Sequence, residues 1–600
     1  MGILCIILCQ ELGMEAEMIK TLAAQIKQYK KASIITPVFM ILEVVFETLI
    51  PFLMASIIDD GVEAGDMHHI YVVGGFMIAA ALCGLFCGVM GGKYGARAST
   101  GFARNLRQAM FDNIQTFSFA SLDKFSTAGL VTRLTTDVTN MQMAYQMLLR
   151  ICFRAPISMI CAMAMAFMIN AELASIYLVA VVLLGIVLAF IIKGAMKYFQ
   201  EAFPKYDELN ASVQENVGAI RVVKAYVRED YETKKLKKAS QNIYDIFLKA
   251  EKRVVLNMPV MQLTVYSCIL LLSWLGAKQI VNNTLTTGEL MSLLTYCMNI
   301  LMSLMMLAMI FVMMSMSIAS ARRICEVLEE KSDLTNPENP LYEVPDGGIA
   351  FEHVWFSYQK ESSEAVLHDV HLNIRPGETI GIIGGTGSAK TSLVNLISRL
   401  YDVKEGAVLV GGHDVREYDL ETLRNQVAVV LQKNVLFSGT ILENLRWGAA
   451  DATEEECKRV CRLACADEFI EKMPEGYHTY IEQGGSNVSG GQKQRLCIAR
   501  ALLKKPKVLI LDDSTSAVDT ATDARIRKAF AEEIPDTTKL IIAQRISSVQ
   551  SADRIMVMED GRISGFGTHE ELLAGNEIYR EVYESQTSGG GDFDEKAGEA

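Results

Sequence analysis

The sequence lacks an excess of basic residues, because 57 lysines and arginines face 70 aspartates and glutamates. The resulting net charge of −13 argues against nucleic acid as a partner, since phosphate backbones are bound by basic surfaces. The chain also lacks a CxxC pair beside a histidine cluster, so its 13 cysteines predict neither a zinc site nor a disulfide framework. Cys457, Cys461 and Cys465 recur every four residues, which only places three thiols along one helix face.

The first residues also lack the features of a targeting segment. Residues 2–9 are apolar but far too short to span a bilayer. They have neither the basic flank nor the small-residue cleavage site of a signal peptide. Met14 or Met18 is therefore a candidate for the true translation start. We expect residues 1–31 to form an N-terminal segment with an amphipathic elbow helix.

Long apolar stretches are abundant, since 50% of the residues are hydrophobic. Six of them approach or exceed the ~20 residues of a membrane-spanning helix, at roughly 34–58, 69–91, 148–169, 173–192, 255–280 and 290–318. They predict an all-α, six-helix membrane domain over residues 32–325, embedded in the lipid bilayer. Lysines and arginines gather before the first stretch and in two long loops, whereas the alternate connections carry none. The N-terminus, both loops and the C-terminal domain are therefore expected in the cytosol.

The two long loops, near 92–147 and 193–254, have helical patterning. Each holds ~55–60 residues, enough for two antiparallel legs that reach ~40 Å beyond the membrane. Short segments at their tips, Ser118–Phe125 and Ala225–Tyr231, are candidates for transmitting motion. Beyond the last apolar stretch, strand-like runs and glycine turns indicate a soluble α/β domain. We predict a linker at 326–347, the α/β domain at 348–584 and a disordered acidic tail at 585–600.

A glycine-rich loop lies between a strand-like run and a helical run, which is the context of a phosphate-binding loop. Its residues are Gly384, Gly385, Thr386, Gly387, Ser388, Ala389, Lys390 and Thr391, followed by Ser392. Small residues let backbone amides close around phosphates, and the helix N-terminus adds its dipole. Lys390 would reach the β- and γ-phosphates of ATP, and the Thr391 hydroxyl would bind Mg²⁺. The usual pattern has Gly where Ala389 stands, and we expect the methyl group to be tolerated if this residue keeps a negative φ.

A second motif, Val508–Asp513, is an apolar strand that ends in two acids. A buried strand that presents an aspartate to the metal completes the site begun by a phosphate-binding loop. Asp512 is therefore a second candidate ligand for Mg²⁺, and the two motifs in this order predict an α/β P-loop NTPase.

Between these motifs, Asn487-Val488-Ser489-Gly490-Gly491-Gln492 closely resembles the signature of ATP-binding-cassette proteins, with Val in place of Leu. The resemblance covers nearly the whole chain and is that of a half-transporter of the multidrug-exporter type, with a type-1 exporter membrane domain fused to its cassette. It implies further site residues by their place in the series. Tyr358 resembles the aromatic residue that stacks on adenine, Gln432 the glutamine that contacts Mg²⁺, Glu482 the acid of the cross-linking loop, and Ser516–Asp519 the loop that faces the partner cassette.

The resemblance also implies a dimer, because two cassettes of this family close head to tail and each ATP lies between one P-loop and the other signature. Two catalytic positions depart from the family pattern. Asp513 replaces the glutamate that acts as general base and is one methylene shorter, and a retreat of ~1 Å from the proton that a base must reach is costly for catalysis. Gln544 replaces the switch histidine and can carry neither a proton nor a positive charge.

The signature itself is nearly intact, so the departures affect only one of the two sites that this chain helps to build. We therefore predict the degenerate-site subunit of a bacterial heterodimeric exporter, integral to the plasma membrane. Its own site would hold ATP and hydrolyse it poorly, while its signature serves the site of a second half-transporter. The alternative is a slow homodimer, or a lipid flippase, with two impaired sites.

Two sets of membrane residues are candidates for contact with the transported compound. Methionines recur on one face of the sixth stretch, where they suit varied apolar ligands or serve as lipid-facing and packing residues; they are Met298, Met302, Met305, Met309, Met313 and Met316. Glu43 and Glu47 share a face of the first stretch, where carboxylates are costly. They could attract cationic compounds, face a solvated inner cavity, or pair with Arg150 or Arg154.

The remaining functional classes differ in how well they fit a membrane chain. Six membrane segments exclude a cassette protein of DNA repair or translation, and importers of this superfamily usually keep membrane and cassette parts on separate chains. We therefore expect an exporter of small amphipathic compounds, whether drugs, lipids or peptides. Nothing in the sequence identifies the compound.

Overall fold

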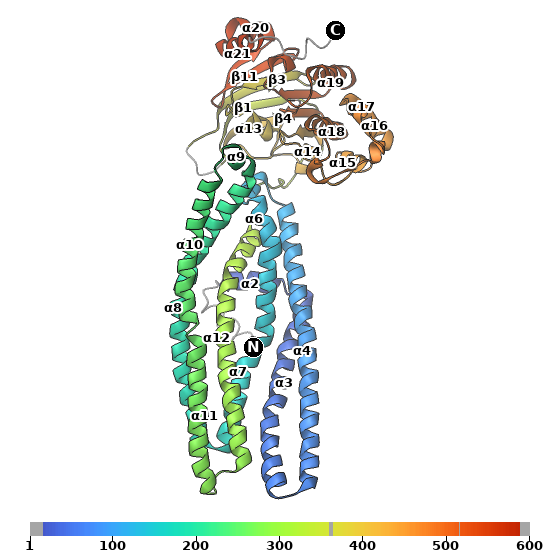
Figure 1. Cartoon of the computed structure of the whole chain (residues 1–600). Coiled ribbons are helices and arrows are strands. Elements are labelled where there is room, and N and C mark those ends of the chain that lie inside the picture. Colours follow the sequence, from blue (N-terminus) through green and yellow to red (C-terminus); the bar gives the residue numbers. More distant parts are fainter. Residues whose placement is uncertain (1–15, 359–363, 515, 589–600) are drawn as a thin grey trace. The chain divides into compact units, whose positions relative to one another are not determined.

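The computed structural model describes residues 16–358, 364–514 and 516–588. These residues form two compact units (Figure 1). The helical unit takes its described residues from Met1–Thr116 and Phe125–Glu330, and the α/β unit from Phe117–Lys124 and Lys331–Ala600. A short piece of the first long loop thus belongs to the α/β unit.

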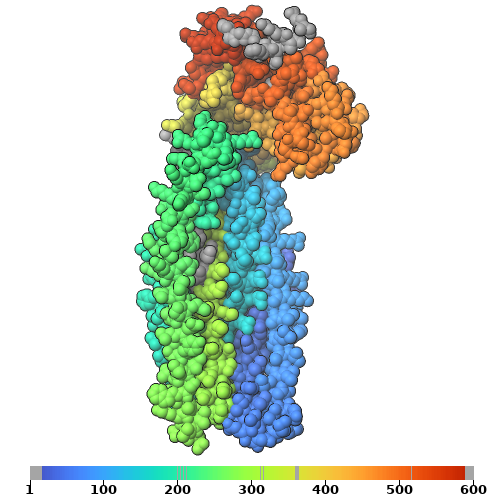
Figure 2. Space-filling view, in the orientation of Figure 1, coloured from blue at the N-terminus to red at the C-terminus, as the bar shows by residue number. Residues whose placement is uncertain are grey.

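The helical unit contains six helices that are long and apolar enough to cross a membrane, which confirms the six predicted spans. In chain order its elements are α2 (Ala16–Ala24), the 3₁₀-helix η1 (Lys27–Tyr29), α3 (Lys30–Ser56), the π-helix η2 (Ile57–Glu63), α4 (Met67–Gln115), α6 (Thr127–Thr132), the π-helix η3 (Arg133–Asp137), α7 (Val138–Ile169), α8 (Ala171–Gly218), α9 (Ile220–Ala225), α10 (Glu229–Val254), α11 (Asn257–Val281) and α12 (Thr287–Glu329). The space-filling view shows α3 and α4 in blue on one flank, α10 and α11 in green on the other, and parts of α7 and α12 between them (Figure 2).

Side-chain caps explain where the helices begin after the short connections. Asp66 Oδ1 accepts hydrogen bonds from the amides of His68 and His69 at the start of α4. Asn170 caps α8 in the same way and leaves a one-residue turn after α7. Thr286 and Glu289 form a reciprocal capping box at the start of α12. These caps therefore supply acceptors to some of the amides that the start of a helix leaves without an intrahelical partner.

The long loops of the sequence are mostly continuations of the spanning helices. α4 has 49 residues and α8 has 48, more than a bilayer requires, and α10 packs along α8. At the first tip, the segment Ser118–Phe125 contains the short helix α5 (Phe119–Lys124). At the second tip, α9 spans Ile220–Ala225, and the segment Ala225–Tyr231 covers its last residue, a turn and the start of α10. Val227 in that turn has φ of 54°, which interrupts the helical path.

The ends of the helical unit differ from the predicted boundaries by a few residues. α2 lies in the predicted elbow segment and buries Met18 and Leu22. Residues 2–9 and Met14 lie outside the described residues. α12 continues to Glu329, so the first four residues of the predicted linker are helical. The change comes at Glu330, whose backbone is extended.

The α/β unit contains a six-stranded sheet whose core is parallel and buried on both faces. Its strands are ordered β12-β11-β3-β10-β9-β6, and a four-stranded sheet is ordered β2-β1-β4-β5. The strands are β1 (Ile349–Phe356), β2 (Leu367–Ile374), β3 (Thr379–Gly384), β4 (Glu405–Val410), β5 (His413–Asp414), β6 (Val427–Val430), β7 (Gly439–Thr440), β8 (Tyr480–Ile481), β9 (Val508–Asp512), β10 (Thr538–Ile542), β11 (Arg554–Glu559) and β12 (Arg562–Gly567). Every residue of β9 and β10 is buried, as expected for the central strands of a parallel sheet, and this includes the polar Thr538 and Lys539 at the start of β10.

The helices of the α/β unit follow the alternating pattern of strands and helices. They are α13 (Lys390–Ile397), α14 (Leu420–Gln426), α15 (Ile441–Arg446), α16 (Glu454–Leu463), α17 (Asp467–Ile470), α18 (Gly490–Leu502), α19 (Thr520–Glu533), α20 (His569–Gly575) and α21 (Glu577–Ser588). α21 makes residues 585–588 of the predicted disordered tail helical, and residues 589–600 lie outside the described residues. Cys457 and Cys461 are buried on α16, and no cluster of metal-binding side chains occurs in the described parts of the chain.

Strand register brings the predicted nucleotide motifs to one edge of the large sheet. Ile542 of β10 pairs with Asp512 of β9 on one side and with Ile382 of β3 on the other. Because these strands are parallel, the loops that follow them leave the sheet at the same edge. The glycine-rich loop after β3, the acids at the end of β9 and Gln544 after β10 are therefore neighbours, although they are far apart in sequence.

Candidate functional site

The glycine-rich loop curls around the side chain of its own lysine. Lys390 Nζ donates to the carbonyl oxygens of Gly384 and Gly385 at 2.8 and 2.7 Å, and lies 3.2 Å from Ser388 Oγ. Burial lowers the pKa of Lys390, while the charges of Asp512 and Asp513 oppose this shift. The loop thus holds a cation at the N-terminus of α13, where phosphate groups are favoured.

 Ala389 has φ of 68° and ψ of 22°, in the left-handed region, so the negative φ on which tolerance of its methyl group depends is absent. The chain must turn sharply from the loop into α13, and glycine takes up this conformation without strain. An alanine there costs roughly 1–2 kcal/mol, because its Cβ approaches the following carbonyl oxygen. Gly387, with φ of 88°, meets a similar demand at no such cost.

Two of the three candidate Mg²⁺ ligands are in direct contact. Thr391 Oγ1 donates to Asp512 Oδ2 at 2.9 Å, and Asp512 is only 3% exposed. Burial raises the pKa of Asp512, whereas the Thr391 hydrogen bond and Lys390 oppose this shift. A hydroxyl and a carboxylate at this edge are oxygen ligands of the kind that Mg²⁺ prefers. Gln432, in the loop after β6, is exposed, and among the described residues no hydrogen bond links its side chain to either of them.

The two positions that depart from the family pattern are bonded to each other. Gln544 Nε2 donates to Asp513 Oδ2 at 2.9 Å, and the Asp513 amide donates to Ile542 O at 3.1 Å. Asp513 itself has φ of 47°. Both side chains line a cavity of about 150 Å³. One carboxylate oxygen of Asp513 is therefore engaged by an amide donor.

The signature residues form the N-terminus of α18. Ser489 Oγ accepts from the Gln492 amide at 3.3 Å, and Gln492 Oε1 accepts from the Ser489 amide at 2.9 Å. This capping box leaves the amides of Gly490 and Gly491 at the exposed start of the helix, where an anion is favoured. A Cβ on Gly491 would lie 2.6 Å from the carbonyl oxygen of Ala517, so this position requires glycine.

The loop Ser516–Asp519 is attached to the signature helix by a residue that sequence reasoning missed. Gln494, 6% exposed, accepts from the Ala517 amide at 3.0 Å and donates to Ser516 Oγ at 3.3 Å. In the sequence, Gln494 is only a polar residue in the helical run that follows the signature, and its burial appears only in the folded chain. Two hydrogen bonds of Gln494 therefore fasten this loop to the signature helix. Glu482 lies nearby in the chain and accepts a hydrogen bond from Ser486 Oγ at 2.7 Å.

Tyr358, the candidate for stacking on adenine, is 43% exposed and lies beside α13. Its hydroxyl is 2.8 Å from Ser392 Oγ. Its ring meets Phe356 and Tyr401 edge-on, with centroids 4.9 and 5.1 Å away. Sequence reasoning did not identify Tyr401, because its role depends on distant segments.

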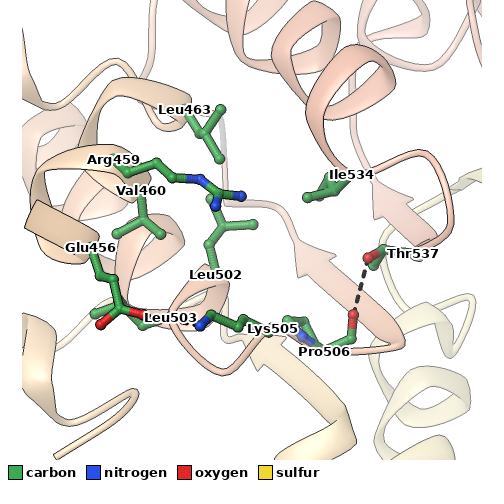
Figure 3. Close-up of a pocket in the computed structure, with 10 residues that line it drawn as sticks. All are labelled: Glu456, Arg459, Val460, Leu463, Leu502, Leu503, Lys505, Pro506, Ile534 and Thr537. Carbon is green, nitrogen blue, oxygen red and sulfur yellow. Dashed lines mark hydrogen bonds and ion pairs between the residues drawn. The ribbon is translucent and has the colours of Figure 1, made fainter. Parts of the chain in front are cut away.

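A further cavity of the α/β unit lies away from these motifs. It has a volume of about 180 Å³, and Figure 3 shows its ten lining residues, including an ion pair between Lys505 and Glu456 at 3.0 Å. Pro506 and Thr537 on its wall precede β9 and β10. It is therefore at the amino ends of these strands, whereas the nucleotide motifs follow their carboxyl ends.

In the helical unit, Glu43 and Glu47 share one arginine. Arg154 Nη1 lies 3.4 Å from Glu43 Oε1, and Arg154 Nη2 lies 2.9 Å from Glu47 Oε2. Gly88 makes room for this group, since a Cβ there would be 3.0 Å from Glu43 Oε1. The side chain of Arg150 packs at a different level, against Gly95. The structure thus selects Arg154 from the two candidate partners and leaves one carboxylate in excess.

The methionine stripe lies on another side of the helical unit. Met298, Met302, Met309 and Met313 are exposed, Met305 packs against a buried cluster, and the side chain of Met316 lies outside the described residues. Tyr296 of α12 faces α3, because its hydroxyl donates to Thr48 O at 2.9 Å. At ~100° per residue the stripe points roughly the opposite way. The methionines and the two glutamates therefore do not form one site within this chain.

Comparisons with known proteins agree with this architecture. Residues 33–305 match the ABC transporter transmembrane region, and residues 367–516 match the ABC transporter family. An uncharacterized ABC transporter ATP-binding protein, YfiB of Bacillus subtilis, is 36% identical over 94% of this chain and 97% of its own length. Rv1273c of Mycobacterium tuberculosis, also uncharacterized, is 36% identical over 94% of this chain and 98% of its own.

Two further comparisons concern a named activity and a solved structure. The ATP-dependent lipid A-core flippase of Desulfotalea psychrophila is 32% identical over 82% of this chain and 85% of its own length. The structure of a bacterial Atm1-family ABC exporter with ATP bound superposes with a TM-score of 0.80 at 22% identity, covering 93% of this chain and 99% of that one. At this identity the second likeness establishes the fold.

Proposed function

Because the chain belongs to the ABC transporter family, as a half-transporter with an exporter-type membrane domain and an ATP-binding cassette, we propose that it is the catalytically impaired subunit of a heterodimeric exporter. Its cassette binds ATP, and the transporter that it belongs to hydrolyses ATP. In this proposal its own P-loop site retains ATP, and its signature completes the productive site of a second half-transporter. The complex lies in the bacterial plasma membrane with both termini of this chain in the cytosol.

The hydrogen bond between Gln544 and Asp513 is the observation that carries this proposal. A general base must bring a carboxylate oxygen within ~2.6–3.2 Å of the attacking water. Asp513 is one methylene shorter than glutamate, and its Oδ2 accepts from the Gln544 amide instead. Gln544 cannot act as the general base instead, because its neutral amide does not take up a proton. The P-loop, by contrast, keeps the groups that hold phosphate.

ATP and Mg²⁺ are the ligands that this site would hold. Lys390 and the amides of the glycine-rich loop would contact the phosphates, and Tyr358 would stack on the base. Thr391 and Asp512 would hold Mg²⁺ through their oxygens, with Gln432 approaching from its loop. When bound, the metal neutralises phosphate charge. These residues bind and orient the nucleotide, whereas Asp513 is poorly placed to activate water.

The first test is to isolate the tagged chain from its native membranes and compare it with the chain expressed alone. We expect a second half-transporter to co-purify, and we expect the complex to hydrolyse ATP at least about tenfold faster than the chain alone, as general-base catalysis contributes about 10²–10⁴. The chain alone should still bind ATP. Full hydrolysis by the chain alone, with no partner recovered, would contradict the heterodimer.

A small amphipathic compound is the proposed cargo, and relatives named as lipid A-core flippases favour a lipid as one alternative, moved by a slow homodimer. The Glu43–Arg154–Glu47 group carries one negative charge in excess, which favours an amphipathic cation. The exposed methionines of α12 would supply adaptable apolar contact.

Glu47→Gln tests the role of this charge. Removing one carboxylate leaves Arg154 paired with Glu43 and the group neutral, so we expect several-fold lower export of a cationic dye and unchanged export of a neutral one. The measurement is dye efflux from cells that express the complex. Glu63→Gln is the matched control, because Glu63 is an exposed acid in η2, just beyond α3. An equal loss for both dyes, or no loss, would rule out charge recognition at this position.

A further inference from the structure

The helix α5 is packed onto the α/β unit by apolar contacts and one polar bond. Phe119 and Ala120 contact the buried cluster that fills the space between the two sheets and α13. The ring of Phe119 meets Tyr401 edge-on, with centroids 6.0 Å apart. Tyr401 Oη donates to Asp123 Oδ2 at 2.6 Å, between residues 278 positions apart in sequence. This is a short hydrogen bond to a carboxylate, and hydrogen bonds of this class are stronger than those between two neutral groups.

Tyr401 remains a donor because its phenol stays protonated. The side chain follows α13 and is 9% exposed. Burial raises the pKa of Tyr401, and the neighbouring Asp123 carboxylate raises it further. Across physiological pH the hydroxyl proton is therefore directed at Asp123, and the bond depends on the position of the tyrosine ring rather than on pH.

The other side of the same ring contacts the candidate base platform. The Tyr401 and Tyr358 rings are nearly perpendicular, at 87°, with centroids 5.1 Å apart. Tyr358 is tied at its hydroxyl to Ser392, the residue after Thr391 of the glycine-rich loop. It remains 43% exposed, so one part of its ring is available to a ligand. A planar base that stacks there would fix the orientation of Tyr358 and of the ring packed against it.

We propose that Tyr401 is a positioning residue that reports the presence of the nucleotide base to α5, through Tyr358 on one side and Asp123 on the other. The proposal rests on the proposed function, in which Tyr358 stacks on adenine. It assigns to the base a role apart from affinity: an ordered Tyr358 ring holds Tyr401 in the geometry of its bond to Asp123. Since α5 lies between α4 and α6 along the chain, base occupancy then stabilises the segment that connects the long helix α4 to the short helix α6.

The test measures backbone hydrogen exchange of residues 117–126 in the full chain, reconstituted in lipid nanodiscs, with saturating ATP or with inorganic tripolyphosphate, which has no base. We expect ATP to slow exchange of this segment by about threefold relative to tripolyphosphate, as expected for a local opening equilibrium. In Tyr401→Phe the difference should vanish, while the Kd for ATP stays within about twofold. Asp123→Ala, which removes the acceptor, should give the same result.

Tyr418→Phe is the matched control, since Tyr418 is also a buried tyrosine of this unit with one hydroxyl bond, to Val410 O at 2.8 Å. It should retain the full difference between the two ligands. A difference that persists in Tyr401→Phe overturns the inference. Tyr358→Ala tests the stacking role of Tyr358 separately from the coupling through Tyr401. It should weaken binding of ATP and leave binding of tripolyphosphate unchanged. If Tyr358→Ala does not weaken ATP binding, Tyr358 is not the base platform, and both this assignment and the inference fail.

Discussion

In the complex purified with its partner, Gly490→Asp is expected to lower ATP hydrolysis about 100-fold, whereas Asp513→Asn in the same chain lowers it by less than about threefold. The first change affects the signature, which in our proposal completes the productive site of the partner. A carboxylate at the start of α18 would meet the phosphates of the ATP held by the partner, where loss of favourable electrostatics costs ~10²–10³ in rate. The second change affects a site to which our proposal assigns little hydrolysis.

Gly490 suits this test because the fold accepts a side chain there. A Cβ at Gly490 would have only the Ala517 Cβ, 3.5 Å away, as a close neighbour, which is ordinary contact. At Gly491 the same change would meet a backbone oxygen at 2.6 Å and would disturb the loop itself. Gly490→Asn is the matched control, since it has nearly the size of aspartate without its charge, and we expect it to lose far less activity.

The measurement is the steady-state rate of ATP hydrolysis by each purified complex, with the amount of bound nucleotide as a second readout. Asp513→Asn should leave bound ATP unchanged, because Lys390 and the loop amides hold the phosphates. If Gly490→Asp and Asp513→Asn reduce the rate equally, both composite sites contribute equally. That outcome would favour the symmetric homodimer.

Local patterns in the sequence were sufficient for the elements of the nucleotide site. The run from β3 through the glycine-rich loop to α13 is continuous in sequence, so its geometry follows from short-range propensities. The acids after β9 could be placed beside it because parallel strands end at a common edge, and the observed register of β3, β10 and β9 is what this argument needs. The backbone of Ala389 could not be foreseen in this way, because its left-handed φ is imposed by the turn.

The choice between Arg150 and Arg154 shows a second limit. These residues are four apart on α7, so both lie on one helix face, and periodicity cannot separate them. Depth in the helix bundle separates them: Arg150 packs against Gly95 of α4, whereas the carboxylates are at the level of Gly88. The contact of Tyr401 with Asp123 was equally inaccessible, because it joins segments that only the folded chain brings together.

A buried ion pair between η3 and α12 holds the helical unit together at the end of the first long loop. Asp137 is fully buried, and its carboxylate accepts from Ser320 Oγ at 2.8 Å and from Arg323 Nε and Nη2 at 2.8 and 2.5 Å. One turn away on each helix, Arg133 Nη2 donates to Glu326 Oε2 at 2.8 Å. The two pairs run in opposite senses, since η3 supplies the acid in one and the base in the other.

Asp137→Ala is therefore expected to destabilise the helical unit by about 3 kcal/mol, the lower part of the range for breaking a buried pair. Arg323 is 46% exposed and can regain some hydration, which limits the loss of stability. Ser320 is buried and loses the acceptor of its hydroxyl, which adds to that loss. Replacing both partners, as Asp137→Leu with Arg323→Met, should recover more than half of the loss, because it removes the uncompensated charge.

The matched control is Lys205→Met in α8, which breaks an ion pair with Glu208 whose side chains are 43% and 64% exposed. Water screens such a pair, so its loss should cost at most about 1 kcal/mol. The measurement is the free energy of unfolding of the full chain in mixed micelles. If Asp137→Ala costs no more than Lys205→Met, the buried carboxylate does not hold η3 to α12. A larger cost, relieved in the double variant, would show that the charge and its burial together specify this contact.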